Sequence, residues 1–134
     1  MKTFIFKQRV YFSDTDAGGI VYHASYLNFA EHARTESLRE ISSVSQGEML
    51  AKFNYGFVVK SIFIDYKKPA FIDDLLTVKT SVKEFKKFSA VFEQLIYREE
   101  ELLTSLEVKV ACIDLATKRP ILIPEEVLKG FNLQ

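Results

Sequence analysis

The sequence is poor in the residues that build stapled, metal-bound or membrane-spanning proteins. It has one cysteine, no tryptophan, three prolines and five glycines among 134 residues. A single cysteine, Cys112, excludes an internal disulfide and a multi-cysteine metal site. No apolar run reaches the roughly 18 residues that a membrane-spanning helix needs, and the first residues lack the apolar block of a signal peptide. We therefore expect a cytoplasmic protein with no membrane span.

Charge of one sign is also not in excess. The 18 lysines and arginines equal the 18 aspartates and glutamates, so the formal net charge is zero. Nucleic-acid binders need a basic surface that displaces counterions from phosphates, and we therefore expect no nucleic-acid partner. The length falls in the usual range of one domain, and 48% of the residues are hydrophobic. These values predict a single domain over residues 1–134.

Hydropathy patterns predict one long helix and several strands. Alternating segments indicate strands over residues 3–12, 57–66, 75–85, 88–98 and 103–115. Helical spacing indicates a long helix near 24–41, a short one within 45–53 and another after Pro124. One helix followed by a run of strands indicates an α+β fold whose antiparallel sheet is covered on one face. Apolar residues on the other face favour a homo-oligomer.

Two candidate chemistries have little support in the sequence. His23 and His32 are nine residues apart with no cysteine nearby, so we expect no metal site. Phosphate-loop and dinucleotide-binding glycine motifs are absent, and no cofactor is expected. Cys112 alternates with Val108 and Val110 on an apolar strand face, which predicts a core cysteine rather than a nucleophile.

The segment from Asp14 to His23 carries the strongest candidate chemistry. It reads Asp-Thr-Asp-Ala-Gly-Gly-Ile-Val-Tyr-His and leads into the long helix. A helix N-terminus offers free N–H groups that can hold a developing oxyanion, and a nearby carboxylate can attack a carbonyl or deprotonate water. The alternative is that Asp14 and Asp16 only shape a turn and cap the helix.

The same segment resembles a family motif. The string from Asp14 to Tyr26, followed by Glu-His-Ala-Arg-Thr-Glu over 31–36, is similar to the hot-dog fold acyl-CoA thioesterases. Within them it resembles the 4-hydroxybenzoyl-CoA thioesterase group and its Tol–Pal-associated (YbgC-type) branch, over nearly the whole chain. The resemblance implies a hot-dog fold, in which a five-stranded antiparallel sheet wraps one long central helix. It also implies homodimers or tetramers, with a dimer of dimers expected, and active sites at the dimer interface.

The resemblance assigns roles to individual residues. Asp16 matches the family's catalytic carboxylate, acting as nucleophile or general base. The backbone N–H of His23 matches the donor that polarises the thioester, and the His23 side chain, where benzoyl-specific members carry tyrosine, is expected to assist catalysis. Gly19 and Tyr22 are expected to bind substrate. The histidine favours short- or medium-chain acyl groups over aromatic ones.

Further residues match the family's substrate contacts. Lys86, Lys87 and Ser89 correspond to its basic segment near the coenzyme A phosphates, which attract cations and hydroxyl groups. The alternative is an ordinary solvated hairpin tip. Val58 and Val59 begin the strand that lines the family's acyl pocket, although by themselves they indicate only core.

The prediction is therefore an acyl-CoA thioesterase without cofactor, with acyl carrier protein as an alternative carrier or partner. Two rivals stay open: a hot-dog dehydratase using His23 with Glu31 or Glu36, and a non-catalytic module that binds acyl thioesters or acyl carrier protein. Glu31 or Glu36 is also the alternative catalytic acid of a thioesterase. The first expectation for Glu31 is a pair with Arg34, three residues along the helix.

Overall fold

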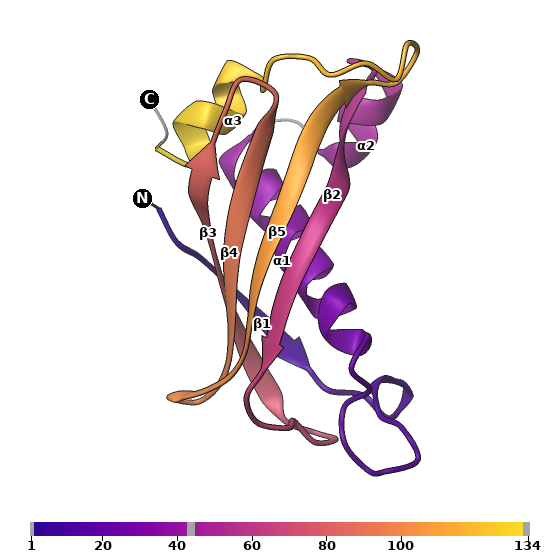
Figure 1. Ribbon diagram of the computed structural model, residues 1–134, viewed down its shortest axis with the longest axis vertical. Helices are drawn as coiled ribbons and strands as arrows, with labels where there is room; N and C mark the ends of the chain where they lie inside the picture. The colour runs from indigo at the N-terminus through magenta and orange to yellow at the C-terminus, as the bar shows by residue number, and fades with distance from the viewer. Residues whose placement is uncertain (1, 43–44, 133–134) are drawn as a thin grey trace.

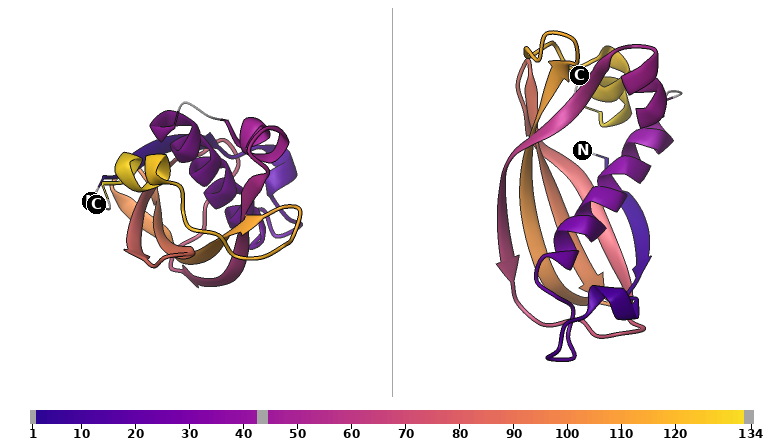
Figure 2. Two further views of the ribbon diagram at one scale, coloured as in Figure 1. Left: turned by 90° about the horizontal axis from the view of Figure 1, so that it is seen from above. Right: turned by 90° about the vertical axis from the view of Figure 1, so that its right-hand side faces the viewer.

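The computed structural model describes residues 2–42 and 45–132 as a five-stranded antiparallel sheet that curves around one long helix (Figures 1 and 2). The strands are β1 (Phe4–Arg9), β2 (Tyr55–Tyr66), β3 (Leu75–Phe85), β4 (Ser89–Arg98) and β5 (Glu101–Asp114). The helices are α1 (Ser25–Ile41), α2 (Gln46–Ala51) and α3 (Glu125–Gly130), with a 3-10 turn η1 (Phe12–Asp14) before α1. The order across the sheet is β1-β3-β4-β5-β2. The expected α+β arrangement is confirmed.

Alternation along the strands places one face of the sheet against α1. Successive strand side chains point to opposite faces, and the positions on one face of β3, β4 and β5 are buried. They comprise Leu76, Val78, Thr80, Val82, Ala90, Phe92, Gln94, Ile96, Leu106, Val108, Val110 and Cys112. The cysteine is therefore a core residue, and burial raises the pKa of its thiol to about 11.

Small side chains let α1 lie close to the sheet. Ala30, Ala33 and Ser37 form a buried stripe, which Tyr26 begins near the helix N-terminus. The helix packs over β1 and β3, and its N-terminal end lies beside the loop that follows β1 (Figure 1). The sequence therefore brings the 15–24 loop to one end of the molecule.

Two local expectations are wrong. The first strand ends at Arg9 rather than Phe12, and Phe12 is 81% exposed. The Asp14 carboxylate accepts the N–H of Tyr11 at 2.8 Å and bends the chain into η1. The hydropathy alternation continues to Phe12, but strand pairing ends at Arg9, because the local hydrogen bond between Tyr11 and Asp14 bends the chain.

The last strand begins at Glu101 rather than at residue 103, because Glu101 pairs with Arg98 across the hairpin. None of the helices in the ranges 2–42 and 45–132 is both long and apolar enough to cross a membrane.

Candidate functional site

A pocket of about 350 Å³ lies at the N-terminal end of α1. The 16–23 loop, the start of α1 and the chain leaving β2 form its walls. Its lining residues are Asp16, Ile20, Val21, His23, Tyr26, Tyr66, Lys67, Lys68 and Pro69. The two residues predicted to be catalytic, Asp16 and His23, therefore share one pocket.

Backbone hydrogen bonds hold the Asp16 carboxylate at the tip of a tight turn. Asp16 Oδ1 accepts the N–H of Gly18 at 2.8 Å, and the Asp16 carbonyl accepts the N–H of Gly19 at 3.0 Å. Gly19 has φ +82°, a conformation that glycine adopts without strain. Among the described residues no group donates to Asp16 Oδ2, so one carboxylate oxygen is available for chemistry.

Hydrogen bonds of Asp14 hold the two ends of the loop together. Its carbonyl accepts the N–H of Tyr22 at 2.8 Å and the hydroxyl of Ser25 at 3.0 Å. Because its side chain is engaged by Tyr11, Asp14 has a structural role.

The start of α1 leaves a backbone donor available at His23, which lines the same pocket as Asp16. Ala24 caps the helix and supplies no side-chain hydrogen bond. Within the described chain, the N–H of His23 donates to no protein acceptor, whereas its carbonyl accepts the Tyr66 hydroxyl at 2.7 Å. The His23 ring lies 4.5 Å from the Tyr22 ring and 6.5 Å from the Tyr66 ring, centroid to centroid. Aromatic contacts and one hydrogen bond thus fix this residue.

A buried phenol closes the inner side of the pocket. The Tyr26 hydroxyl accepts the N–H of Ala70 at 3.2 Å. Burial raises the pKa of Tyr26 above its ordinary value, so the phenol stays neutral.

The predicted substrate-binding residues do not all reach this pocket. Gly19 and Tyr22 belong to its loop but are not in its lining. Lys86 and Lys87 line a separate hollow with the 122–128 segment, and Ser89 borders a third one nearby. These hollows lie at the β3–β4 hairpin, the opposite end of the sheet from the 16–23 loop (Figure 1). Within one protomer the lysines and Asp16 form no common site.

An apolar cavity of about 130 Å³ lies between α1 and the inner face of the sheet. Val59 and Phe92 line it, together with Glu31 and Arg34 of α1, whereas Val58 lines a groove beside α2. Arg34 donates to Gln94 Oε1 at 2.9 Å rather than to Glu31, which corrects the expected pair. Burial lowers the pKa of the guanidinium.

The alternative helix carboxylates lie elsewhere. Glu31 accepts the hydroxyl of Thr35 and borders this cavity rather than the Asp16 pocket, and Glu36 is exposed. In the part of the chain that the structure describes, no group of three or more histidine, cysteine or acidic residues is placed so that it could hold a metal ion.

Sequence reasoning missed the second wall of the pocket. Tyr66, Lys67, Lys68 and Pro69 lie more than 40 residues after Asp16. The strand predicted over residues 57–66 ends at Tyr66, and no role is predicted for the residues that follow it. An aromatic residue and two lysines before a proline form a weak signal, because nothing in their spacing links them to the loop.

Comparison with known proteins shows consistent similarities. Residues 10–131 match the family described as the thioesterase-like superfamily. A protein of Haemophilus influenzae named acyl-CoA thioesterase YbgC is 47% identical, over 96% of this chain and 94% of that protein. Acyl-CoA thioester hydrolase YbgC of Escherichia coli O6:H1 is 40% identical, over 98% and 99%. The crystal structure of a probable thioesterase from Bartonella henselae superposes with TM-score 0.86 at 34% identity, over 92% and 100%.

Proposed function

Because the chain belongs to the thioesterase-like superfamily and is an acyl-CoA thioesterase, we propose that Asp16 and the helix start at His23 cleave the thioester. One observation carries the proposal: Asp16, which has an available carboxylate oxygen, and His23, which has an available backbone N–H, line the same pocket. The substrates are short- or medium-chain acyl-CoAs, and the products are the free acid and coenzyme A. The reaction takes place in the cytoplasm.

The N–H of His23 supplies the electrostatic part of the mechanism. The thioester carbonyl oxygen accepts this N–H and gains negative charge as the acyl carbon is attacked. The N-terminus of α1 adds the positive end of its dipole. A preorganised backbone donor of this kind contributes about 10²–10³ in rate.

Asp16 supplies the base or the nucleophile. As a base it takes a proton from water, the hydroxyl oxygen bonds to the acyl carbon, and the tetrahedral oxyanion collapses. The C–S bond then breaks, and the departing thiolate receives the proton. As a nucleophile Asp16 bonds to the acyl carbon directly, the C–S bond breaks, and coenzyme A leaves as its thiolate, which takes a proton from water. Water then hydrolyses the mixed anhydride to the free acid and the Asp16 carboxylate. The His23 imidazole, which borders the same pocket, orients the water or the leaving thiolate.

The distance between the two ends of the protomer supports a site shared between copies. Coenzyme A carries its phosphates far from its thiol, and Lys86, Lys87 and Ser89 lie at the end of the sheet opposite Asp16 (Figure 1). Strand β2 is an edge strand with exposed apolar side chains, including Phe63 at 66%. Antiparallel pairing of β2 with a second copy brings opposite ends of two protomers together. We propose this dimer, and a dimer of dimers, as the active form.

The same geometry disfavours the dehydratase. An acid–base couple of His23 with Glu31 is not assembled within one protomer, because the two residues line different cavities. Glu36 lies on an exposed helix position and borders neither cavity.

The test is release of free thiol from a panel of acyl-CoAs and acyl carrier protein thioesters. We expect Asp16→Asn to lower kcat/KM at least about 100-fold. Asp114→Asn is the matched control, since Asp114 Oδ2 accepts the N–H of Thr117 at 2.8 Å in a similar turn at the end of β5. Asp114→Asn should retain full activity.

Equal activity of the Asp16→Asn variant would assign catalysis to Glu31 or Glu36. No thiol release from any thioester would instead favour the non-catalytic binding module. Mass spectrometry after hydroxylamine is added during turnover tests for the nucleophilic route, because an Asp16 hydroxamate indicates the anhydride.

A further inference from the structure

We propose that Arg98, which does not line the reaction pocket, is a positioning residue for it. Its guanidinium holds the segment Lys67–Ala70, and that segment holds the loop bearing Asp16 and His23. The inference rests on the proposed function, because it assumes that the Asp16 pocket is the reaction site.

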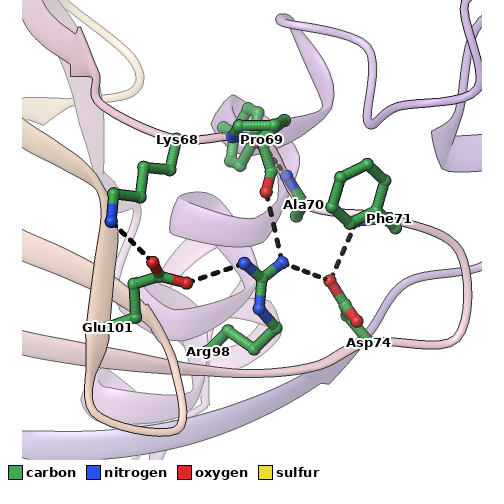
Figure 3. Close-up of polar contacts among 8 residues, drawn as sticks. Lys68, Pro69, Ala70, Phe71, Asp74, Arg98 and Glu101 are labelled. Carbon is green, nitrogen blue, oxygen red and sulfur yellow. Dashed lines mark hydrogen bonds and ion pairs between the residues drawn. The ribbon is translucent and has the colours of Figure 1, made fainter.

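The Arg98 guanidinium joins three separate parts of the chain (Figure 3). Nη1 donates to the Pro69 carbonyl at 3.2 Å and to Asp74 Oδ2 at 2.9 Å. Nη2 donates to Glu101 Oε1 at 2.7 Å, and Glu101 Oε2 accepts the Lys68 ammonium at 2.7 Å. Arg98 therefore binds the segment Lys67–Ala70 directly at the Pro69 carbonyl. It also binds the segment indirectly, through Glu101, which accepts from both Arg98 and Lys68.

Ala70, at the end of the same segment, forms hydrogen bonds with the loop that bears Asp16 and His23 and with the start of α1. The Ala70 carbonyl accepts the N–H of Val21 at 2.9 Å, and the Ala70 N–H donates to the Tyr26 hydroxyl at 3.2 Å. Tyr66, just before the segment, donates to the His23 carbonyl at 2.7 Å. Displacement of residues 66–70 would therefore move Val21 and His23, the residues on either side of Tyr22.

The Arg98–Asp74 pair is better sheltered than an ordinary surface pair. The side chains of Arg98 and Asp74 are 28% and 20% exposed, whereas those of the Lys83–Glu107 pair are 50% and 43% exposed. The hydrogen bonds that Arg98 donates to Asp74 and Glu101 raise the pKa of Arg98. The hydrogen bonds that Glu101 accepts from Lys68 and Arg98 lower the pKa of Glu101, so Arg98 and Glu101 stay charged near neutral pH.

The hydrogen bonds of Arg98 to Pro69, Asp74 and Glu101 require a planar group with several donors. A guanidinium offers several donors in fixed directions, whereas an ammonium is a single point of charge. The Arg98 guanidinium also lies 5.6 Å from the centre of the Phe71 ring. Lysine at position 98 keeps the charge but cannot hold Pro69, Asp74 and Glu101 together.

Small displacements at a reaction site reduce rates steeply, because the reacting atoms must be held in line. We expect Arg98→Met to lower kcat at least about tenfold with KM changed less than about threefold. Arg98→Lys should recover less than half of the lost kcat. The matched control is Lys83→Met, which removes one cation from an exposed pair and should leave both constants unchanged.

Amide hydrogen exchange provides a readout that needs no activity. In Arg98→Met the N–H of Val21, which bonds to Ala70, should exchange at least about tenfold faster. The N–H of Cys112 in β5, which bonds to the Phe88 carbonyl at 2.9 Å, should be unchanged. Glu101→Gln, which weakens the cluster without removing the arginine, gives the same pattern in smaller measure and serves if Arg98→Met fails to fold.

The outcomes separate the two proposals. Unchanged kcat and unchanged exchange at Val21 in the arginine variants would overturn the positioning role. Faster exchange together with a wild-type protein that releases no thiol would support the clamp and refute the proposed function. A parallel rise of exchange at Val21 and Cys112 would show general destabilisation and also overturn the inference.

Discussion

Gln94 connects the long helix to the middle of the sheet. Its side chain is fully buried and donates to the Ala30 carbonyl at 2.9 Å and to Thr80 Oγ1 at 3.0 Å. Its oxygen accepts from Arg34, so the amide uses its donors and its acceptor within the protein. A satisfied polar group in a core fixes the position of the elements that it joins.

Gln94→Leu should lower the free energy of unfolding by about 2–4 kcal/mol, because Arg34 loses its acceptor at a partly buried site. Urea unfolding of this variant, of Arg34→Met and of the double variant measures the coupling. The double variant should lose less than the sum of the single changes. Additive losses would mean that the two side chains act independently.

Cys112 makes stability depend on alkaline pH. Its folded-state pKa is about 11, against about 9 when unfolded, so the folded chain binds the proton more tightly. Stability is therefore full below pH 9 and falls as the pH rises towards 11. Urea unfolding from pH 8 to 11 should show a shallower decline for Cys112→Ala than for the unaltered chain. Tyr55, whose pKa is about 12, contributes equally to both; parallel curves would contradict the assignment to the thiol.

Sequence reasoning found half of the candidate site. Asp16 and His23 are separated by only seven positions, and the glycines between them announce a tight turn. The wall formed by Tyr66, Lys67 and Lys68 depends on how β2 ends against α1. Such a contact follows from tertiary packing, which no local pattern encodes.

At the scale of whole elements, the close contact between α3 and α1 is a point of tight packing. A Cβ atom added at Gly130 would lie 2.4 Å from Cβ of Ile41, well inside contact distance. Gly47 in α2 is a natural comparison, since an added Cβ there would meet Ser45 Oγ at 3.7 Å.

Gly130→Ala should therefore destabilise the fold by about 1–3 kcal/mol through overpacking. Gly47→Ala should be neutral or stabilising, because alanine favours helix. Thermal unfolding compares the two variants, and Ile41→Ala should relieve part of the Gly130→Ala cost. Equal melting temperatures for the two alanine variants would show that α3 can shift away from α1 without a loss of stability.

Element boundaries follow the local chemistry more than the hydropathy period. The prediction for β3 matches the structure over residues 75–85, since turn residues flank it on both sides. The prediction for β1 ran three residues too far, because the alternation of Val10 and Phe12 says nothing of the Asp14 carboxylate that bends the chain.

The molecule as a whole has two unequal sheet edges. β2 is 12 residues long and carries exposed Val59 and Phe63, whereas β1 is six residues long and carries exposed Ile5. Long apolar edges pair readily with other strands. The sequence predicted an oligomer from the apolar second face of the sheet and from the family resemblance, but which edge pairs depends on the strand order.

Phe63→Asp should give a monomer with little thioesterase activity, because the two ends of different protomers can no longer combine. Ile5→Asp, at 61% exposure on the other edge, should keep both oligomer and activity. Sedimentation velocity and thiol release measure the two properties, and circular dichroism verifies the fold. An active Phe63→Asp monomer would contradict the shared site.

The separation of Asp16 from Lys86 and Lys87 has a kinetic consequence. If each working site takes groups from two protomers, the number of sites grows with the square of protein concentration when protomers are mostly apart. Turnover per milligram would then fall on dilution and recover on concentration, without any effector. The concentration of the protein would itself set the rate at which each milligram of it hydrolyses acyl-CoA.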